Sequence, residues 1–234
     1  MNKTVKTILV IIGVIVVFAL IFFLSEAIKP KYLKEITKEE YKEIIKNKDV
    51  YVYIGGKGDG YSEIANFAKE NGAKVYYLKS DDKEGSLVEY KEGKEALVIK
   101  DFSDYKYKRK LIKSGFVKNQ LLEVTIPEYF EIIKEDEYNF MFLGSAECGY
   151  CSMFKPVLAE IAGDYDVNLY YIDLYNADEK DLNTLYSSDE YFTTEEWGTP
   201  LNFLMKGGKR IAVLNGYNEY DSVVEFFKTN GVIK

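Results

Sequence analysis

Hydrophobic residues follow helical or strand spacing along most of this chain, and one N-terminal segment follows neither. Residues 8–24 are apolar and uncharged throughout. With one residue added at each end, they would form a helix of about 28 Å, close to the ~30 Å hydrocarbon core of a bilayer. The pattern therefore predicts a transmembrane helix within residues 1–27.

Two other interpretations of this segment stay open. Small residues at Ser25 and Ala27 offer a site for a signal peptidase, so the segment could be cleaved, and a buried core helix could also be this apolar. The apolar run is long for a signal peptide, and a large domain behind a single span crosses a membrane largely regardless of its charge. We therefore expect an uncleaved single-pass anchor in the cell membrane, with the C-terminal domains extracytoplasmic.

The remainder of the chain contains one pattern twice. The segment EEYKEIIK at 39–46 returns as PEYFEIIK at 127–134, and an apolar strand follows each copy. Further matches keep the same order, through a tyrosine-rich strand, a glycine-containing hairpin turn and a closing helical segment. This ordered series predicts a tandem duplication, with one domain over 36–118 and a second over 124–234.

Each domain reads as helix, strand, helix, strand, hairpin and helix, with a short linker over 119–123 between them. The strand that begins at Asn139 is almost continuously apolar, as a strand covered on both faces would be. Gly207 and Gly208 mark the turn of the second hairpin. The predicted fold class is α/β: an N-terminal transmembrane helix, then two tandem domains, each a central mixed sheet with helices on both faces.

The composition restricts the chemistry that this fold could carry. The chain has no histidine, two cysteines, and 31 Lys and Arg against 38 Asp and Glu, for a net charge of −7. Without His there is no His-based nucleophile pair, general base or metal ligand, and two Cys alone cannot complete a tetrahedral zinc site. An acidic chain is also a poor nucleic-acid binder, so we expect no metal, no nucleic acid and no separate cofactor.

The two cysteines, Cys148 and Cys151, stand where the apolar strand ends and a helical pattern begins. At this spacing on a first helical turn, both sulfur atoms lie on one side and can form a disulfide. The unpaired N–H groups of a helix N-terminus stabilise a thiolate on the first Cys, whose pKa would fall from ~8.5 into the range of about 3.5–7.5. Cys148 is thus the expected nucleophile, and Cys151 the residue that resolves a mixed disulfide.

Three other roles for the pair stay open on this evidence. The two Cys could be half of a zinc site that a second chain completes. They could form an inert structural disulfide, although a loop this short gains little loop-closure entropy. They could also be two buried apolar residues. A redox-active dithiol is favoured because strand, CxxC and helix follow one another and a Thr-Pro pair occurs later in the chain.

Residues 124–234 resemble a thioredoxin-family domain over essentially their whole length. The resemblance rests on the CGYC motif at a helix start and on positions that follow in the family's order: Met153, Pro156, Ile172-Asp173, Gly198-Thr199-Pro200, Gly208 and Gly216. It implies that Pro200 has a cis peptide bond and faces the dithiol, and that the backbone just before it pairs with extended substrate chains. Thr199 and the CGYC motif are similar to those of bacterial extracytoplasmic disulfide isomerases.

The residues within and beside the motif are expected to tune it. In the family, the dipeptide between the cysteines (here Gly149 and Tyr150) and the residue before the cis-proline set the reduction potential, where about 30 mV corresponds to 1.4 kcal/mol. Glu147 replaces the usual Trp before the first Cys. A carboxylate there would oppose formation of the thiolate, unless it points into solvent.

A buried ion pair of the thioredoxin family is missing from this sequence. The acid that lies six residues before the first Cys is Phe142 here, and its lysine partner is Leu169. The acid and the lysine are expected to be lost together, because a single buried charge left without its partner would destabilise the fold by several kcal/mol. We expect slower turnover than that of thioredoxins.

The first domain repeats the layout without cysteines. Asp59 and Ser62 stand where the cysteines would be, and Gly85 falls near the position of Pro200. We interpret it as a degenerate thioredoxin-like domain, which could hold substrate, mediate dimerisation or space the second domain from the bilayer.

The connection from Asp173 to Pro200 is longer than in thioredoxins and strongly acidic. Against one lysine it carries seven carboxylates: Asp178, Glu179, Asp181, Asp189, Glu190, Glu195 and Glu196. Beside Pro200 it would form an acidic rim that favours neutral or basic substrate segments, while an ordinary solvated helix is the alternative. Trp197 either forms a wall beside the dithiol or packs in the core.

Together these observations predict a membrane-anchored, extracytoplasmic thiol–disulfide oxidoreductase of isomerase or reductase type. Its partners would be thiols and disulfides of proteins or peptides, together with a membrane or extracytoplasmic redox protein. The Cys148–Cys151 pair would be its only redox group. The alternative is a redox-inactive tandem thioredoxin-fold module that binds or chaperones exported chains and carries a vestigial CxxC.

Overall fold

The computed structural model describes residues 32–234 except 48 and 82–84. The predicted transmembrane segment lies outside the described residues. In the part of the chain that is described, none of the helices is both long and apolar enough to span a membrane. The described residues form two compact units that divide between Lys100 and Asp101, and each unit has its own five-stranded sheet.

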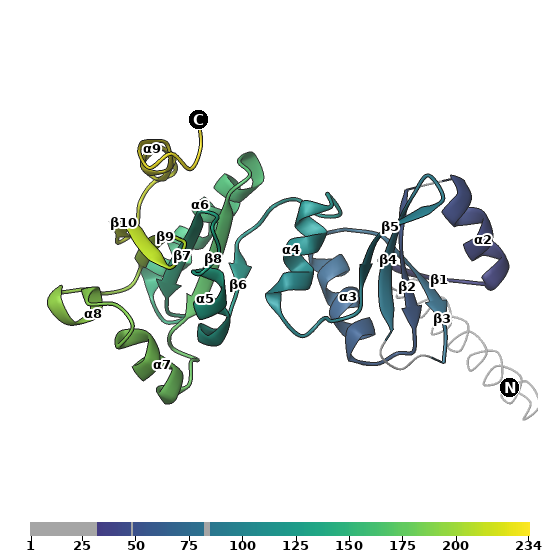
Figure 1. The fold of residues 1–234 in the computed structure, drawn as a ribbon, viewed down its shortest axis with the longest axis horizontal. Helices are drawn as coiled ribbons and strands as arrows, with labels where there is room; N and C mark the ends of the chain where they lie inside the picture. Colours follow the sequence, from purple (N-terminus) through teal and green to yellow (C-terminus); the bar gives the residue numbers. More distant parts are fainter. Residues whose placement is uncertain (1–31, 48, 82–84) are drawn as a thin grey trace, which may run out of the picture. The chain divides into compact units, whose positions relative to one another are not determined.

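The first unit contains a mixed sheet in the order β1-β3-β2-β4-β5 (Figure 1). Its elements are β1 (Leu33–Ile36), α2 (Lys38–Asn47), β2 (Val50–Gly55), α3 (Asp59–Glu70), β3 (Val75–Lys79), β4 (Ser86–Lys91) and β5 (Lys94–Ile99). Strands β1, β3 and β2 run parallel, and β4 and β5 add an antiparallel hairpin beside β2.

Different helices cover the two faces of this sheet, as the α/β pattern predicts. On one face, Tyr41, Ile44 and Ile45 of α2 pack against the strands. On the other face, the ring of Tyr61 in α3 packs against the rings of Tyr53 and Tyr77.

The second unit contains a mixed sheet in the order β10-β9-β7-β8-β6. Its elements are α4 (Tyr105–Lys113), β6 (Leu122–Glu123), α5 (Ile126–Ile132), β7 (Asn139–Gly144), α6 (Gly149–Asp164), β8 (Asn168–Asp173), α7 (Glu179–Tyr186), α8 (Tyr191–Thr194), β9 (Leu201–Lys206), β10 (Lys209–Asn215) and α9 (Tyr220–Thr229). Strands β6, β8 and β7 run parallel, and β9 and β10 form the antiparallel hairpin. The two sheets have the same topology, which is consistent with two tandem thioredoxin-like domains.

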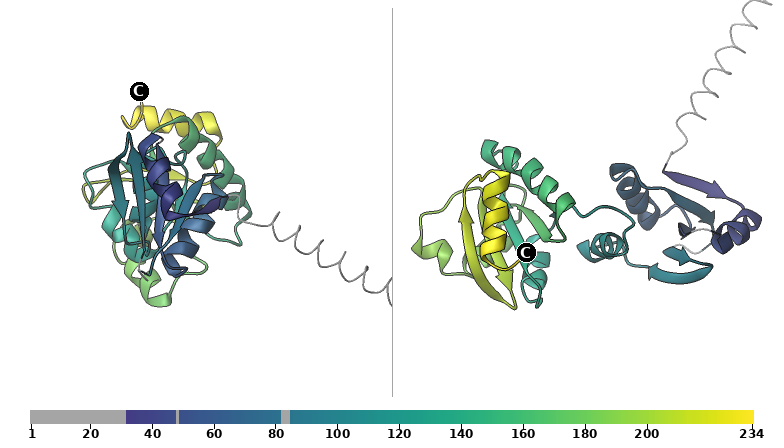
Figure 2. Two further views of the ribbon diagram at one scale, coloured as in Figure 1. Left: turned by 90° about the vertical axis from the view of Figure 1, so that its right-hand side faces the viewer. Right: turned by 90° about the horizontal axis from the view of Figure 1, so that it is seen from above.

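The central strand β7 is buried along its whole length, as its apolar sequence predicts. Because side chains alternate along a strand, Met141 and Leu143 join the core beneath α5, α7 and α8, whereas Phe140 and Phe142 join the core beneath α6 and α9. Helices α6 and α9 lie beside each other on that second face (Figure 2).

Two short strands are not evident from the sequence pattern. β1 pairs with β3, and β6 pairs with β8 through two residues, Leu122 and Glu123, within the segment expected to be a linker. Strands of four and two residues are too short to show a period, so only the sheet that they join reveals them.

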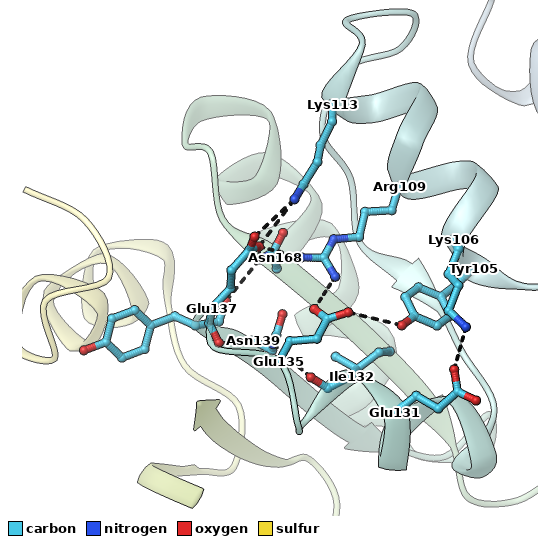
Figure 3. Close-up of polar contacts among 11 residues, drawn as sticks. Tyr105, Lys106, Arg109, Lys113, Glu131, Ile132, Glu135, Glu137, Asn139 and Asn168 are labelled. Carbon is cyan, nitrogen blue, oxygen red and sulfur yellow. Dashed lines mark hydrogen bonds and ion pairs between the residues drawn. The ribbon is translucent and has the colours of Figure 1, made fainter. Parts of the chain in front are cut away.

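Helix α4 groups with the second unit, whereas the sequence places it at the end of a first domain over 36–118. The ring of Tyr105 lies in the second unit's core, 5.9 Å from that of Tyr170. Arg109 forms ion pairs with both Glu135 and Glu137 (Figure 3). Aromatic packing attaches α4 to β8, and the ion pairs attach it to the segment between α5 and β7. The observed division therefore falls before this helix rather than at residue 118.

Candidate active site

The cysteine pair lies at the carboxyl end of the central strand of the second unit. β7 ends at Gly144, a three-residue loop follows, and Cys148 is the N-cap of α6. Its backbone is extended, with φ −83° and ψ 113°, and its Sγ atom accepts a hydrogen bond from the backbone N–H of Cys151 at 3.1 Å. The sulfur thus takes the place of the side-chain oxygen that usually caps a helix.

The two sulfur atoms are at bonding distance, and the Cα atoms of Cys148 and Cys151 are 5.2 Å apart. Cys148 is partly exposed, while Cys151 is fully buried beneath the helix. A substrate can therefore reach the sulfur of Cys148 but not that of Cys151. The roles of Cys148 as nucleophile and Cys151 as resolving residue stay a prediction.

The Thr-Pro pair lies directly beside the first cysteine. The peptide bond between Thr199 and Pro200 is cis, as the resemblance implies. The sulfur of Cys148 is 3.4 Å from the carbonyl oxygen of Thr199. In the disulfide this sulfur has no proton to donate, but a reduced Cys148 thiol at the same place could donate one to that oxygen.

The three tuning residues are all exposed: Glu147, Gly149 and Tyr150. A Cβ atom added at Gly149 would meet nothing within 4 Å, so local packing does not require glycine there. Tyr150, next to it in the motif, is 64% exposed.

The carboxylate of Asp173, at the end of β8, holds the loop that leads to the dithiol. It accepts hydrogen bonds from the backbone N–H groups of Ala146 and Tyr175, each at 3.1 Å, and from Asn176 at 2.6 Å. Burial raises the pKa of Asp173, but these hydrogen bonds outweigh burial and hold the pKa below its ordinary value. The loop is thus anchored by a carboxylate that stays ionised.

The floor beneath the dithiol is apolar where thioredoxins carry an acid. Phe142 is fully buried, and its ring packs against the rings of Phe154 and Tyr171, with centroids 5.4 and 4.9 Å away. Leu169 lies in the same core cluster. The predicted replacement of the buried pair by packed apolar residues agrees with this arrangement.

Three residues of this region escape the sequence analysis: Lys155, Tyr171 and Asn202. Asn202 is a buried polar residue in an apolar strand, where it donates to the carbonyl oxygen of Leu214 at 2.7 Å. Its position in the run LNFLM is the signal that could have identified it. Lys155 has no such signal, because lysine is common on exposed helix faces.

Trp197 packs in the core and not beside the dithiol. Its ring lies near those of Tyr186 and Phe192, and its Nε1–H donates to the Phe192 carbonyl oxygen at 3.3 Å. These residues belong to the cluster on the opposite sheet face from Cys151. The prediction that Trp197 forms a wall beside the dithiol is therefore wrong, and the alternative, packing in the core, holds.

The acidic connection forms α7 and α8. One of its seven carboxylates, Asp189, is bound by Arg210 of β10 through two hydrogen bonds of 2.8 and 3.0 Å. This residue fastens the connection to the hairpin and contributes little to a rim. A steering role for the remaining carboxylates stays a prediction.

In the first unit, the residues at the positions of the cysteines are Gly58 and Tyr61. Gly58 is the N-cap of α3, as Cys148 is of α6, and Tyr61 comes three residues later. The sequence alignment with Asp59 and Ser62 is off by one residue, because the loop before α3 is one residue shorter than that before α6. Tyr61 is partly buried, and its ring lies 4.9 Å from that of Tyr77.

No group of three or more Cys, Asp or Glu residues that could hold a metal ion occurs within 32–234, gaps at 48 and 82–84 aside. The paired sulfur atoms themselves are the chemically distinctive feature of the described residues.

No protein-family model matches this chain. Similar solved structures include thioredoxin f from spinach chloroplast, at 19% identity over 48% of this chain and 95% of the other, with a TM-score of 0.40. Thioredoxin f2 from Chlamydomonas reinhardtii matches at 15% identity over 49% and 99%, with a TM-score of 0.40. Thioredoxin from Trypanosoma brucei brucei matches at 16% identity over 47% and 94%, with a TM-score of 0.38.

These matches are thioredoxin-fold neighbours of low similarity, and the functional argument rests on the geometry of the site. A CxxC-spaced cysteine pair at bonding distance, with one sulfur accessible at a helix N-terminus, indicates a thiol–disulfide oxidoreductase.

Proposed function

We propose that this protein is a thiol–disulfide oxidoreductase that reduces or isomerises disulfides of protein or peptide substrates outside the cytoplasm. The observation that carries the proposal is the asymmetry of the pair: Cys148 is partly exposed, and its sulfur caps a helix and lies 3.4 Å from the Thr199 carbonyl oxygen, whereas Cys151 is buried. An inert structural disulfide has no need of an accessible sulfur at a helix N-terminus.

The reaction proceeds by two exchanges from the reduced dithiol. The Cys148 thiolate attacks one sulfur of a substrate disulfide, a mixed disulfide forms, and the other substrate sulfur leaves as a thiolate that takes up a proton. The Cys151 thiol then loses its proton, and its sulfur attacks the Cys148 sulfur. The second substrate thiolate leaves, the Cys148–Cys151 disulfide forms, and two electrons have passed to the substrate.

The same intermediate serves isomerisation. If a second thiol of the substrate attacks the mixed disulfide before Cys151 does, the substrate leaves with a new disulfide and the dithiol stays reduced. In net reduction, a thiol reductant must restore Cys148 and Cys151 after each turnover. We assign this supply of electrons to a membrane or extracytoplasmic redox protein.

The helix N-terminus contributes to the first exchange. The N–H of Cys151 donates to Cys148 Sγ, and this bond and the helix dipole both favour negative charge on that sulfur. The Thr199 backbone and Pro200 are assigned to substrate binding, where an extended segment would lie along the edge that they present. Single-pass membrane attachment through residues 1–27 belongs to the same proposal, supported by the apolar run at 8–24.

The proposed function is tested by the reduction potential of the pair in the full-length chain, measured by equilibration with defined dithiol buffers. A redox-active pair titrates as a two-electron couple between about −270 and −120 mV. A value near −270 mV supports a reductase, and one near −180 mV an isomerase. A value below about −300 mV would identify a structural disulfide and contradict the proposal.

A further inference from the structure

The resolving step requires the buried Cys151 to lose a proton, and the groups around it offer little help. Cys151 is fully buried, and the core cluster that contains it also holds Phe142, Phe154 and Leu169. Burial in apolar surroundings disfavours a thiolate. Some other charged group near the first turns of α6 must therefore ease this step if it is to occur at neutral pH.

Lys155 is placed to be that group. It follows Cys151 by four residues on α6, so their Cβ atoms are neighbours on one face of the helix, about 5–6 Å apart. Side chains of a helix tilt toward its N-terminus, so the stem of Lys155 extends over the turn that contains Cys151. The residue is partly buried, and its Nζ atom lies 3.5 Å from the centroid of the Tyr171 ring.

Tyr171 holds this ammonium near the start of the active-site loop. In the sheet it pairs directly with Phe142, whose ring contacts it. A Cβ atom added at Gly144, the last residue before the loop, would lie 2.9 Å from an edge carbon of the Tyr171 ring. The ring therefore lies beneath the end of β7, and a cation over its face is favoured by about 0.5–2 kcal/mol.

Tyr171 itself stays neutral. Burial raises the pKa of its phenol above the ordinary value. The charges of Asp173 and Glu123 raise that pKa further. The ring therefore stays uncharged and presents a face on which the Lys155 ammonium can lie.

Other titratable groups lie on the elements around the dithiol: Glu123 of β6, Glu147 of the loop, Tyr150 of α6, Asp173 of β8, and Tyr217 and Glu219 before α9. Asp173 and Glu123, the latter paired with Tyr171 in the sheet, are the carboxylates whose charges act on Tyr171. Asp173 accepts three hydrogen bonds, and the charge of Lys155 also helps to hold its pKa below the ordinary value. Glu147 and Glu219 are exposed, where solvent screens them. Lys155 is thus the cation of this set.

We propose that Lys155 is a positioning residue for the proposed reaction: its ammonium, held on the Tyr171 ring, favours the thiolate of Cys151 and so promotes resolution of the mixed disulfide. The inference rests on the proposed function for its biological meaning. Its physical content, a charge that acts on one thiol, is testable without turnover.

The first measurement uses the full-length Cys148→Ser chain, in which Cys151 is the single thiol. The rate of alkylation of Cys151 is followed against pH with Lys155, with Lys155→Met and with Lys155→Arg, because only the thiolate reacts. The methionine variant is expected to titrate about 1 unit higher, and the arginine variant close to the parent. Equal midpoints for all three, or equal shifts for methionine and arginine, would overturn the proposal.

The second measurement follows resolution of a preformed mixed disulfide at Cys148 in chains that retain Cys151. A 1-unit rise in the pKa lowers the thiolate fraction about 10-fold but makes the thiolate more nucleophilic, so Lys155→Met should slow resolution at pH 7 about 3- to 4-fold. Formation of the mixed disulfide in a Cys151→Ser background should stay unchanged. A chain that forms no mixed disulfide at all would contradict the proposed function, whereas the titration would still decide the role of Lys155.

Discussion

The sulfur of Cys148 lies 3.4 Å from the carbonyl oxygen of Thr199, a residue 51 positions further along the chain. Two features of the sheet produce this contact. Cys148 follows β7, Pro200 precedes β9, and β7 and β9 are antiparallel neighbours. The end of one strand and the start of the other therefore meet at the same edge, where they form the two sides of the site.

The carboxylate beside the motif should slow the first exchange. Glu147 is exposed next to Cys148, so its charge opposes the thiolate through a screened interaction. In a Cys151→Ser background, Glu147→Gln should raise the alkylation rate of Cys148 at pH 7 by about threefold at low salt, and by much less in 1 M salt.

The matched control for this charge effect is Glu160→Gln, which removes an exposed carboxylate further along α6. It should leave the alkylation rate unchanged. A rate for Glu147→Gln equal to that of the parent at low salt would show that the carboxylate has no effect on the thiolate.

The apolar floor should not accept the acid that thioredoxins carry. Phe142 is fully buried at the position of that acid. The position of the lysine that pairs with the acid in thioredoxins is occupied by Leu169. Phe142→Asp should lower the free energy of unfolding by at least ~3 kcal/mol at pH 8, because an unpaired carboxylate would be buried. Phe142→Leu should cost about 1 kcal/mol.

The loss in Phe142→Asp should also depend on pH. A buried carboxyl has a folded-state pKa above its unfolded value, so the destabilisation grows as pH rises above ~4 and is smaller at pH 5 than at pH 8. Urea unfolding at both pH values measures it. Equal stabilities of the aspartate and leucine variants at pH 8 would contradict the apolar floor.

The ion pair between Asp189 and Arg210 should stabilise the second unit in a pH-dependent way. Burial raises the pKa of Asp189, but its hydrogen bonds to Arg210 and to the Tyr191 N–H hold the pKa below the ordinary value. Stability from a carboxyl with a lowered folded-state pKa is present above its unfolded pKa of ~3.9 and is lost as pH falls through the folded value. Asp189→Asn should therefore cost about 2 kcal/mol at pH 7 and progressively less below pH 4.

Thermal or urea unfolding from pH 7 to pH 2 measures this difference. Asp166→Asn, at an exposed position of the same unit, is the control and should change little at any pH. A cost for Asp189→Asn that does not diminish in acid would show that the carboxylate charge is not what fastens α7 and α8 to β10.

The sequence predicts the parts of this fold whose signals are long or specific. The apolar run in β7, the Gly207–Gly208 turn and the repeated helix are each visible in the residues, and each is present in the structure. Cys148, Cys151 and Pro200 were predicted for the site because each has a chemical signature, and the fold brings the sulfur atoms and the Thr199–Pro200 bond together.

Other features depend on contacts that no local pattern encodes. The grouping of α4 with the second unit follows from the ion pairs of Arg109 with Glu135 and Glu137, whereas the repeat places this helix with the first domain. The position of Tyr61, which corresponds to that of Cys151, is not visible in the sequence repeat, because the loop before α3 is one residue shorter than the loop before α6. Lys155 and Tyr171 are meaningful only as a pair, 16 positions apart, that α6 and β8 bring together.

The central claim, that Cys148 attacks and Cys151 resolves, is tested most directly by trapping. The full-length Cys151→Ser chain is incubated with a reporter protein that contains one accessible disulfide, beside Cys148→Ser as the matched control. The account predicts a covalent complex with the Cys151 variant that disappears on addition of reductant, and none with the Cys148 variant. No complex with either variant, or equal complexes with both, would contradict the account.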